Sequence, residues 1–234
     1  MADSHEKERV NIPDAKITRI PLTKTELEKA AKKRLSVITK EFKEGFEFIR
    51  HYPRSVTFFG SSRFQPDNKH YQTARRIAYA LSNAGYAIVT GGGPGIMEAA
   101  NYGALESGGP SVGLNIEIPN EQVTNPYVTT SINFYYFFSR KVVLSFAAEA
   151  YIFFPGGFGT LDEFFEMITL VQTGKIPRVP IILVGSDFWK PLHAFIKKEL
   201  YEEHKAIDKE DMDIYTITDD EKKIIEIVKS APQR

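Results

Sequence analysis

The chain has 234 residues, of which 42% are hydrophobic and 26% charged, a size and composition suited to one α/β domain with a hydrophobic core. The formal net charge is zero, with 30 basic and 30 acidic residues, so no basic face for nucleic acid is indicated. There is no cysteine, which excludes disulfides, thiolate nucleophiles and cysteine-ligated metals. The polar N-terminus does not look like a signal peptide and the apolar runs are too short for a membrane helix, so we expect a soluble, cytoplasmic protein.

The N-terminal part divides into a polar arm and a helix. Residues 1–24 are polar and punctuated by proline, which is typical of a flexible arm. Over residues 25–50, apolar side chains recur at steps of three and four, which predicts an amphipathic helix with Thr25 as a candidate cap. This helix precedes the first strand. It serves either as an oligomer contact or as a cover for the sheet of its own subunit.

From residue 55 onward, short apolar segments alternate with amphipathic ones, and a long loop extends to about residue 130. This alternation predicts a doubly wound, Rossmann-like parallel sheet with helices on both faces, and one domain over 25–234 including the leading helix. The expected strands are 55–60, 86–90, 110–116, 150–154, 179–185 and 214–218. The expected helices are 70–85, 95–107, 133–148, 160–174, 188–203 and 219–230.

Glycine-bearing junctions follow three of the expected strands, at the sheet edge where ligands bind in such folds. A helix N-terminus offers unpaired N–H groups to an anion, and glycine lets a phosphate approach the backbone. Glycines that merely ease a turn are the alternative for any single loop, and the two serines could cap the turn that follows them. The candidate phosphate-binding residues are Gly60, Ser61 and Ser62, then Gly91, Gly92, Gly93 and Gly95, and then Gly156, Gly157 and Gly159.

Standard phosphate fingerprints are missing from these junctions. The pattern G-x-G-x-x-G fails at Ile96 when counted from Gly91, and no G-x-x-x-x-G-K-[ST] loop is present. The sequence therefore favours a monophosphate over a dinucleotide or a nucleoside triphosphate.

Glu163 is open to two interpretations. Thr160-Leu161-Asp162-Glu163 has the form of a capping box, in which Glu163 folds back onto the backbone. Alternatively, Glu163 lies one turn inside a helix whose tip holds the phosphate, so its carboxylate reaches the sugar. Arg140 and Lys141 lie in an aromatic, otherwise apolar helix, where a guanidinium normally seeks a carboxylate.

Other residues add less. Met97 and the aromatic residues 134–138 could flank a purine, although such aromatics more often belong to a core or a subunit interface. The five histidines are scattered without ligand spacing, so we expect no metal.

Two of the glycine segments together resemble one family. The stretches "GGGPGIMEAA" (91–100) and "PGGFGTLDE" (155–163) are similar to those of the LONELY GUY family of cytokinin riboside 5'-monophosphate phosphoribohydrolases, often labelled lysine-decarboxylase-like. The resemblance spans about residues 55–203, and the longer chain and its leading helix resemble the larger, higher-oligomer branch.

This resemblance implies a homo-oligomeric hydrolase without cofactor or metal. Its reaction would be hydrolysis of the N-glycosidic bond of an adenosine 5'-monophosphate, N6-modified or plain, with Arg140 and Glu163 as the catalytic pair. Gly156, Gly157, Gly159 and Thr160 would bind the 5'-phosphate, with help from Gly92, Gly93 and Gly95. Met97 and Lys141 are further candidates for substrate contact. Two alternatives remain: a non-catalytic nucleotide or cofactor carrier, which needs no such pair, and a pyridoxal-phosphate enzyme, for which Lys141 has no evident pyridinium partner.

Overall fold

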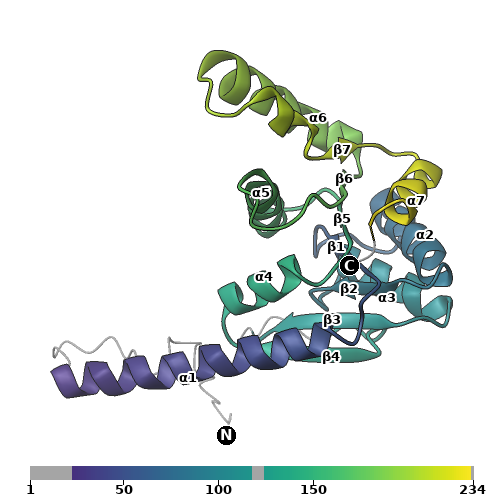
Figure 1. Cartoon of the computed structure of the whole chain (residues 1–234). Helices are drawn as coiled ribbons and strands as arrows, with labels where there is room; N and C mark the ends of the chain where they lie inside the picture. Colours follow the sequence, from purple (N-terminus) through teal and green to yellow (C-terminus); the bar gives the residue numbers. More distant parts are fainter. Residues whose placement is uncertain (1–22, 118–123, 233–234) are drawn as a thin grey trace, which may run out of the picture.

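A computed structural model describes residues 23–117 and 124–232 (Figure 1). The expected arm over residues 1–24 lies outside the described residues except for its last two. In the described part, seven parallel strands form one sheet in the order β4-β3-β2-β1-β5-β6-β7. The strands are β1 (Ser55–Phe59), β2 (Ala87–Thr90), β3 (Ser111–Ile116), β4 (Thr130–Phe134), β5 (Ala150–Phe153), β6 (Ile181–Leu183) and β7 (Thr216–Ile217).

Helices cover both faces of this sheet, as the alternating pattern predicts (Figure 1). The α-helices are α1 (Lys24–Ile49), α2 (Lys69–Asn83), α3 (Ile96–Glu106), α4 (Phe137–Ser145), α5 (Phe158–Gln172), α6 (Ser186–Phe195) and α7 (Glu221–Lys229). A π-helix, η1 (Ile196–Glu203), continues α6, and a 3₁₀ helix, η2 (Lys209–Asp213), follows it. Within the described ranges, no helix combines the length and apolar character that a membrane span requires.

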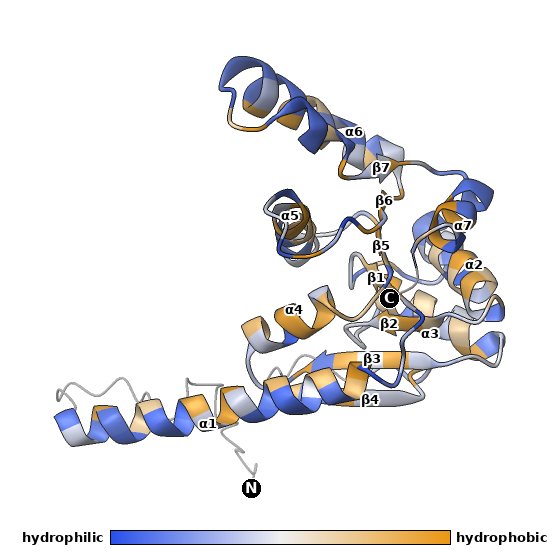
Figure 2. Ribbon diagram, in the orientation of Figure 1, coloured by the Kyte–Doolittle hydropathy of each residue, from blue (hydrophilic) through white to orange (hydrophobic). Residues whose placement is uncertain are grey.

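Two hydrophobic cores flank the sheet because neighbouring strand residues point to opposite faces. Phe58 belongs to the core under α2, α3 and α7, while Phe59 belongs to the core under α4, α5 and α6. Figure 2 shows the apolar residues concentrated on the central strands and the helix faces next to them. The fold class predicted from the sequence is therefore confirmed.

The strand order reverses next to β1. The chain proceeds outward from β1 through β2 and β3 to β4, then returns to the other side of β1 with β5. Loops that leave β1 and β5 at their carboxyl ends therefore diverge, and a crevice opens between them, the usual ligand position in such sheets.

Several element ends shift by a few residues, and two differences from expectation concern the helices next to the site. Residues 130–134 form the edge strand β4 beside β3, so the helix expected over 133–148 begins only at Phe137. The leading helix is capped by Thr23 rather than Thr25, because Thr23 and Glu26 form a reciprocal capping box. The C-terminal half of α1 packs on α4 and β4, so it covers its own subunit there.

Candidate active site

A cleft of about 1120 Å³ opens at the carboxyl ends of β1, β2 and β5. It brings together residues from all three glycine junctions, and from the helices α3, α4 and α5. The predicted site residues that line it are Gly60, Ser61, Ser62, Met97, Arg140, Lys141, Gly156, Gly157, Gly159, Thr160 and Glu163.

The N-terminus of α5 faces this cleft without a side-chain cap. Its N-cap is Gly157, which makes no side-chain hydrogen bond, and the helix begins at Phe158. Thr160 therefore lies inside the helix, and the capping-box interpretation of Thr160 and Glu163 is wrong. The first N–H groups of a helix have no intrahelical acceptor and carry the positive end of its dipole, so an anion fits at this point.

Glycine is required at position 156 by a close approach. A Cβ atom there would lie 2.1 Å from Thr160 Oγ1, which is far inside van der Waals contact. At Gly157 and Gly159, by contrast, a Cβ atom would meet nothing within 4 Å. The backbone of this turn is thus packed on one side against Thr160 and open on the side where the two exposed glycines lie.

The loop after β1 is tied to both other junctions. The Ser61 N–H donates to the carbonyl oxygen of Pro155 at 3.0 Å, and the Ser61 carbonyl accepts from the Ile96 N–H at 3.0 Å. Gly95 has a φ of +71°, and a Cβ atom on it would lie 2.2 Å from the Ser61 carbonyl oxygen. Ser61 Oγ accepts a hydrogen bond from the Arg63 N–H at 3.1 Å, so Ser61 does cap its own turn.

The glycines of the second junction lie behind the wall of the cleft, which corrects the expectation for three of them. Gly92, Gly93 and Gly95 are buried and do not line it; Gly91 and Pro94 do. The Gly92 N–H donates to Thr90 Oγ1 at 2.9 Å, so it is already satisfied. These three glycines support the loop from behind, and their positions do not favour direct contact with a phosphate.

A buried polar network holds this loop, and it was missed in the sequence. Asn125 donates from its backbone N–H to the Gly92 carbonyl at 2.9 Å and from Nδ2 to the Gly93 carbonyl at 3.0 Å. Asn125 Nδ2 also donates to Asn101 Oδ1 at 3.0 Å, and Thr90 Oγ1 donates to the same oxygen at 2.7 Å. An asparagine in a loop between strands carries no signal that it reaches back to a glycine run more than thirty residues earlier.

Arg140 and Glu163 both line the cleft, but no direct ion pair joins them in the described part of the chain. Glu163 is only 7% exposed, and its burial raises its pKa to about 7, against the opposing effect of the Arg140 charge. Burial likewise lowers the pKa of Arg140, against the effect of Glu163. Desolvation thus outweighs the attraction of the Arg140 charge, and the carboxyl group titrates near neutral pH.

The guanidinium of Arg140 is held closely by its surroundings. Its Nη1 would lie 3.1 Å from a Cβ atom placed on Gly91, and its Cζ stands 5.6 Å from the centroid of the Phe137 ring. Its Nε is buried with no hydrogen-bond partner among the described residues. Gly91 thus gives the arginine the room that a larger residue would take.

Lys141 points to a different set of acids. Its Nζ donates to Asp162 Oδ2 at 2.8 Å and lies 3.3 Å from Glu166 Oε2. Burial acts to lower the pKa of Lys141, but the hydrogen bond to Asp162 and the charge of Glu166 outweigh it, so its pKa is raised. The pair of carboxylates was not predicted; their spacing of four residues on one helix face was the available signal.

The comparisons with known proteins point to one family. Residues 97–228, more than half of the chain, match the model of a family described as possible lysine decarboxylases. A cytokinin riboside 5'-monophosphate phosphoribohydrolase of Rhodococcoides fascians is 29% identical over 167 residues, covering 68% of this chain and 79% of that protein. The enzyme of the same name from Arabidopsis thaliana is 30% identical over 157 residues, covering 64% of this chain and 71% of that protein.

The chain belongs to the LONELY GUY family.

Solved structures agree with the fold of this family member. An X-ray structure from a structural genomics consortium has a TM-score of 0.58 at 23% identity and covers 75% of this chain and 98% of that chain. The molybdenum cofactor binding protein from Rippkaea orientalis has a TM-score of 0.56 at 20% identity and covers 76% of this chain and 96% of that chain. At these identities the likeness shows the fold alone.

The family is also described as possible lysine decarboxylases, whose chemistry normally uses pyridoxal phosphate on a lysine. Lys141 is the lysine of the described cleft lining, and its ammonium is held by two carboxylates. A Schiff base forms from a neutral amine, which this arrangement disfavours. The residues present do not fit that cofactor. Nor does any group of three His, Asp or Glu residues in the described ranges come together as a metal site.

Aromatic residues form the rim of the cleft in this family member. Phe137, Phe158 and Phe188 line it, and Phe158 is 92% exposed. Of the expected aromatic set 134–138, Phe134 is instead fully buried in the core. Met97 lines the cleft as expected, whereas Phe188, from α6, was missed because it lies far from the motifs in the sequence.

Proposed function

We propose that this protein hydrolyses the N-glycosidic bond of an adenosine 5'-monophosphate, plain or N6-modified, to give the free base and ribose 5-phosphate. The observation that carries the proposal is that Arg140 and the buried Glu163 line the same cleft as the uncapped N-terminus of α5. The names of the relatives support the same activity independently.

The 5'-phosphate is assigned to the start of α5. Gly157 and Gly159 leave the backbone exposed there, and the helix dipole favours a negative group. The serines of the β1–α2 loop, Ser61 and Ser62, line the same cleft, and their hydroxyl groups can donate to the remaining phosphate oxygens. With the phosphate at this point, the ribose lies about one helical turn along α5, beside Glu163.

Glu163 then acts on the sugar and on water. Loss of the base leaves positive charge on C1' and the ring oxygen, and an adjacent carboxylate stabilises that charge. The carboxylate also removes a proton from the attacking water; the water oxygen bonds to C1', the electron pair of the broken bond leaves with the base, and a proton ends on the base. A pKa of about 7 suits this role because the group is a base near neutral pH.

Arg140 contributes a positive charge to the cleft from a guanidinium whose Nε is buried. It contacts the phosphate or orients the Glu163 carboxylate in the bound complex, because a guanidinium can form two parallel hydrogen bonds to either group. A carrier of nucleotides or cofactors would also use the phosphate site, but it would gain nothing from a buried carboxylate near the sugar.

The test is to incubate the protein with AMP and with isopentenyladenosine 5'-monophosphate and to assay ribose 5-phosphate. Glu163→Gln is expected to abolish release while AMP binding, measured by calorimetry, stays close to that of the unmodified protein. Glu44→Gln, an exposed glutamate on α1, is the matched control and should change neither. Tight AMP binding without release by the unmodified protein would support the carrier instead.

A further inference from the structure

Helix α4 carries Arg140 and Lys141, yet its own sequence does not cap it. Its N-cap residue, Tyr136, makes no side-chain hydrogen bond, and its first turn contains no acidic residue. The first N–H groups of a helix need acceptors from outside the helix, especially where water is excluded. The acceptor for α4 therefore has to come from another part of the fold.

That acceptor is a glutamate of α1. Glu41 Oε1 accepts hydrogen bonds from the backbone N–H groups of Tyr135 and Tyr136, the second at 3.3 Å. Glu41 is 8% exposed, whereas the other glutamates of α1 face solvent. Carboxylates are seldom buried unless they are paired, and a negative charge at a helix N-terminus is favourable. The two backbone hydrogen bonds account for Oε1, while Oε2 is buried with no hydrogen-bond partner among the described residues.

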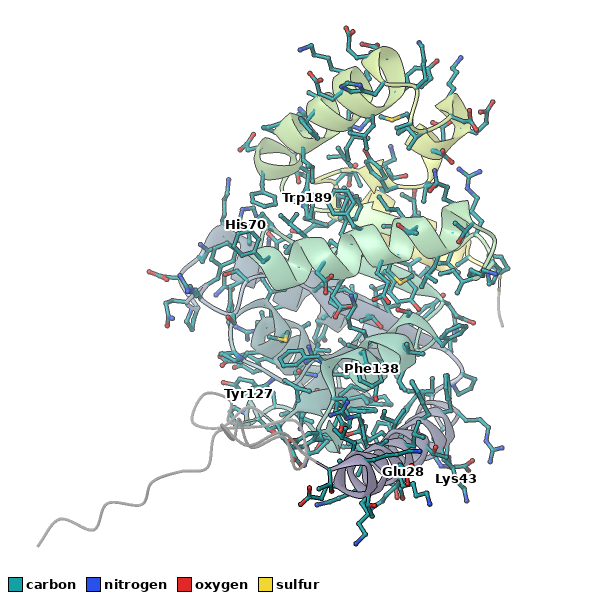
Figure 3. The ribbon with its side chains drawn as sticks, turned by 90° about the vertical axis from the view of Figure 1, so that its left-hand side faces the viewer. Glu28, Lys43, His70, Tyr127, Phe138 and Trp189 are labelled. Carbon is teal, nitrogen blue, oxygen red and sulfur yellow. The ribbon has the colours of Figure 1, made fainter. Side chains whose placement is uncertain are left out.

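Helices α1 and α4 lie close enough for this contact because the residue of α1 at this close approach is a glycine, which has no side chain. Gly45 is one turn after Glu41, and a Cβ atom on it would lie 2.7 Å from Val143 Cγ2 of α4. Figure 3 looks along α1, with Phe138 of α4 above it. A glutamate and a glycine on one face of α1 thus contact α4, the glutamate at the N-cap residue and the residue before it, and the glycine at Val143.

Tyr136, which Glu41 contacts, is also hydrogen-bonded to Arg140. The Arg140 N–H donates to the carbonyl oxygen of Tyr136 at 3.2 Å, so the residue that Glu41 holds also anchors the backbone of the arginine. We propose that Glu41 is a positioning residue, which caps α4 from α1 and so fixes the Arg140 guanidinium in the cleft. The inference rests on the proposed function for its effect on turnover, but not for its effect on α4.

Three substitutions at one position separate charge from reach. Glu41→Ala removes the acceptor, and Glu41→Asp keeps the charge but is one methylene too short to reach Tyr135 and Tyr136. Glu41→Gln keeps an acceptor of the same length. We expect Ala and Asp to lower kcat for AMP by about tenfold or more, with KM changed by less than about threefold, since small displacements of catalytic groups are costly. Gln should retain most of the activity, and Glu44→Ala, a solvent-facing neighbour, should match the unmodified protein.

A double-mutant cycle with Arg140→Ala distinguishes positioning from general destabilisation. If Glu41 acts through Arg140, Glu41→Asp should cause little further loss in the Arg140→Ala background. Losses that multiply in the double variant, or a kcat of Glu41→Asp within about twofold of the unmodified protein, would overturn the proposal, because both would make Glu41 independent of Arg140.

Hydrogen exchange of backbone amides tests the cap independently of catalysis. Amides in residues 135–145 should exchange faster in Glu41→Asp and Glu41→Ala, while those of α2 should not change, because α2 lies on the other face of the sheet. If the unmodified protein releases no ribose 5-phosphate, the proposed function fails, but faster exchange in α4 still supports the cap. Unchanged exchange in α4 refutes the cap whatever the activity.

Discussion

Glu163→Gln should make the protein more stable at high pH while it abolishes catalysis. Burial raises the pKa of Glu163 from its ordinary value of 4.5 to about 7. The folded protein therefore holds a proton on this group in the pH range where the unfolded chain has lost it. Protonated Glu163 therefore does not oppose folding below about pH 4.5. The free energy of unfolding falls as the pH rises from about 4.5 through about 7.

The size of this effect follows from the same pKa. Each pKa unit is worth about 1.4 kcal/mol, so an ionised Glu163 costs on the order of 3 kcal/mol of folding free energy above neutral pH. Glutamine has nearly the same shape and never ionises, so the substitution removes that cost. The unfolding free energy of Glu163→Gln, relative to the unmodified protein, should rise by roughly this amount between about pH 5 and about pH 9.

Urea denaturation at several pH values measures the difference. The Glu44→Gln control, on an exposed side chain, should show no such trend. The activity of the unmodified protein should rise through about pH 7 as Glu163 becomes a base. A stability difference that does not depend on pH, or one that favours the unmodified protein at high pH, would mean that Arg140 keeps Glu163 ionised throughout and that burial does not dominate.

Three further results are expected. Arg140→Lys keeps the charge but loses the bidentate geometry, so kcat should fall by about 10²-fold with little change in the unfolding free energy; an unchanged kcat would remove Arg140 from the mechanism. Gly156→Ala places a methyl group 2.1 Å from Thr160 Oγ1, so it should raise the KM for AMP and cost about 1–3 kcal/mol of stability, whereas Gly159→Ala, with nothing within 4 Å, should leave the stability unchanged. Light scattering should give more than the monomer mass of 26.5 kDa, because Phe46, Phe138 and Phe146 are large exposed side chains on α1 and α4; a monomeric mass contradicts this.

The order of the elements could be predicted because strands buried on both sides read as short apolar runs between amphipathic helices. The edge strand β4 could not. Its Thr130, Ser131 and Asn133 are exposed, so it lacks the apolar run of a central strand, and its alternation covers only residues 131–134. The aromatic residues that follow it then extended the helical pattern of α4 backwards.

The candidate site was predictable where the chemistry is local. Gly156 and Glu163 belong to one short segment of the sequence, so the uncapped helix end and the buried acid could be related by their spacing alone. The loop from Gly91 to Gly95 was not predictable, since a glycine run looks the same whether its amides face a ligand or a distant Asn125. Glu41 was equally hidden, because one glutamate of an amphipathic helix gives no sign that it meets a backbone more than ninety residues away.

If the proposed function holds, the glycine at the N-cap of α5 also couples the lifetime of the protein to its supply of ligand. Since Gly157 has no side-chain oxygen to cap the helix, the proposed phosphate takes the place of a capping side chain, and its binding free energy adds to that of folding. Cells rich in the nucleotide should therefore degrade this protein more slowly than cells depleted of it, without any dedicated regulator.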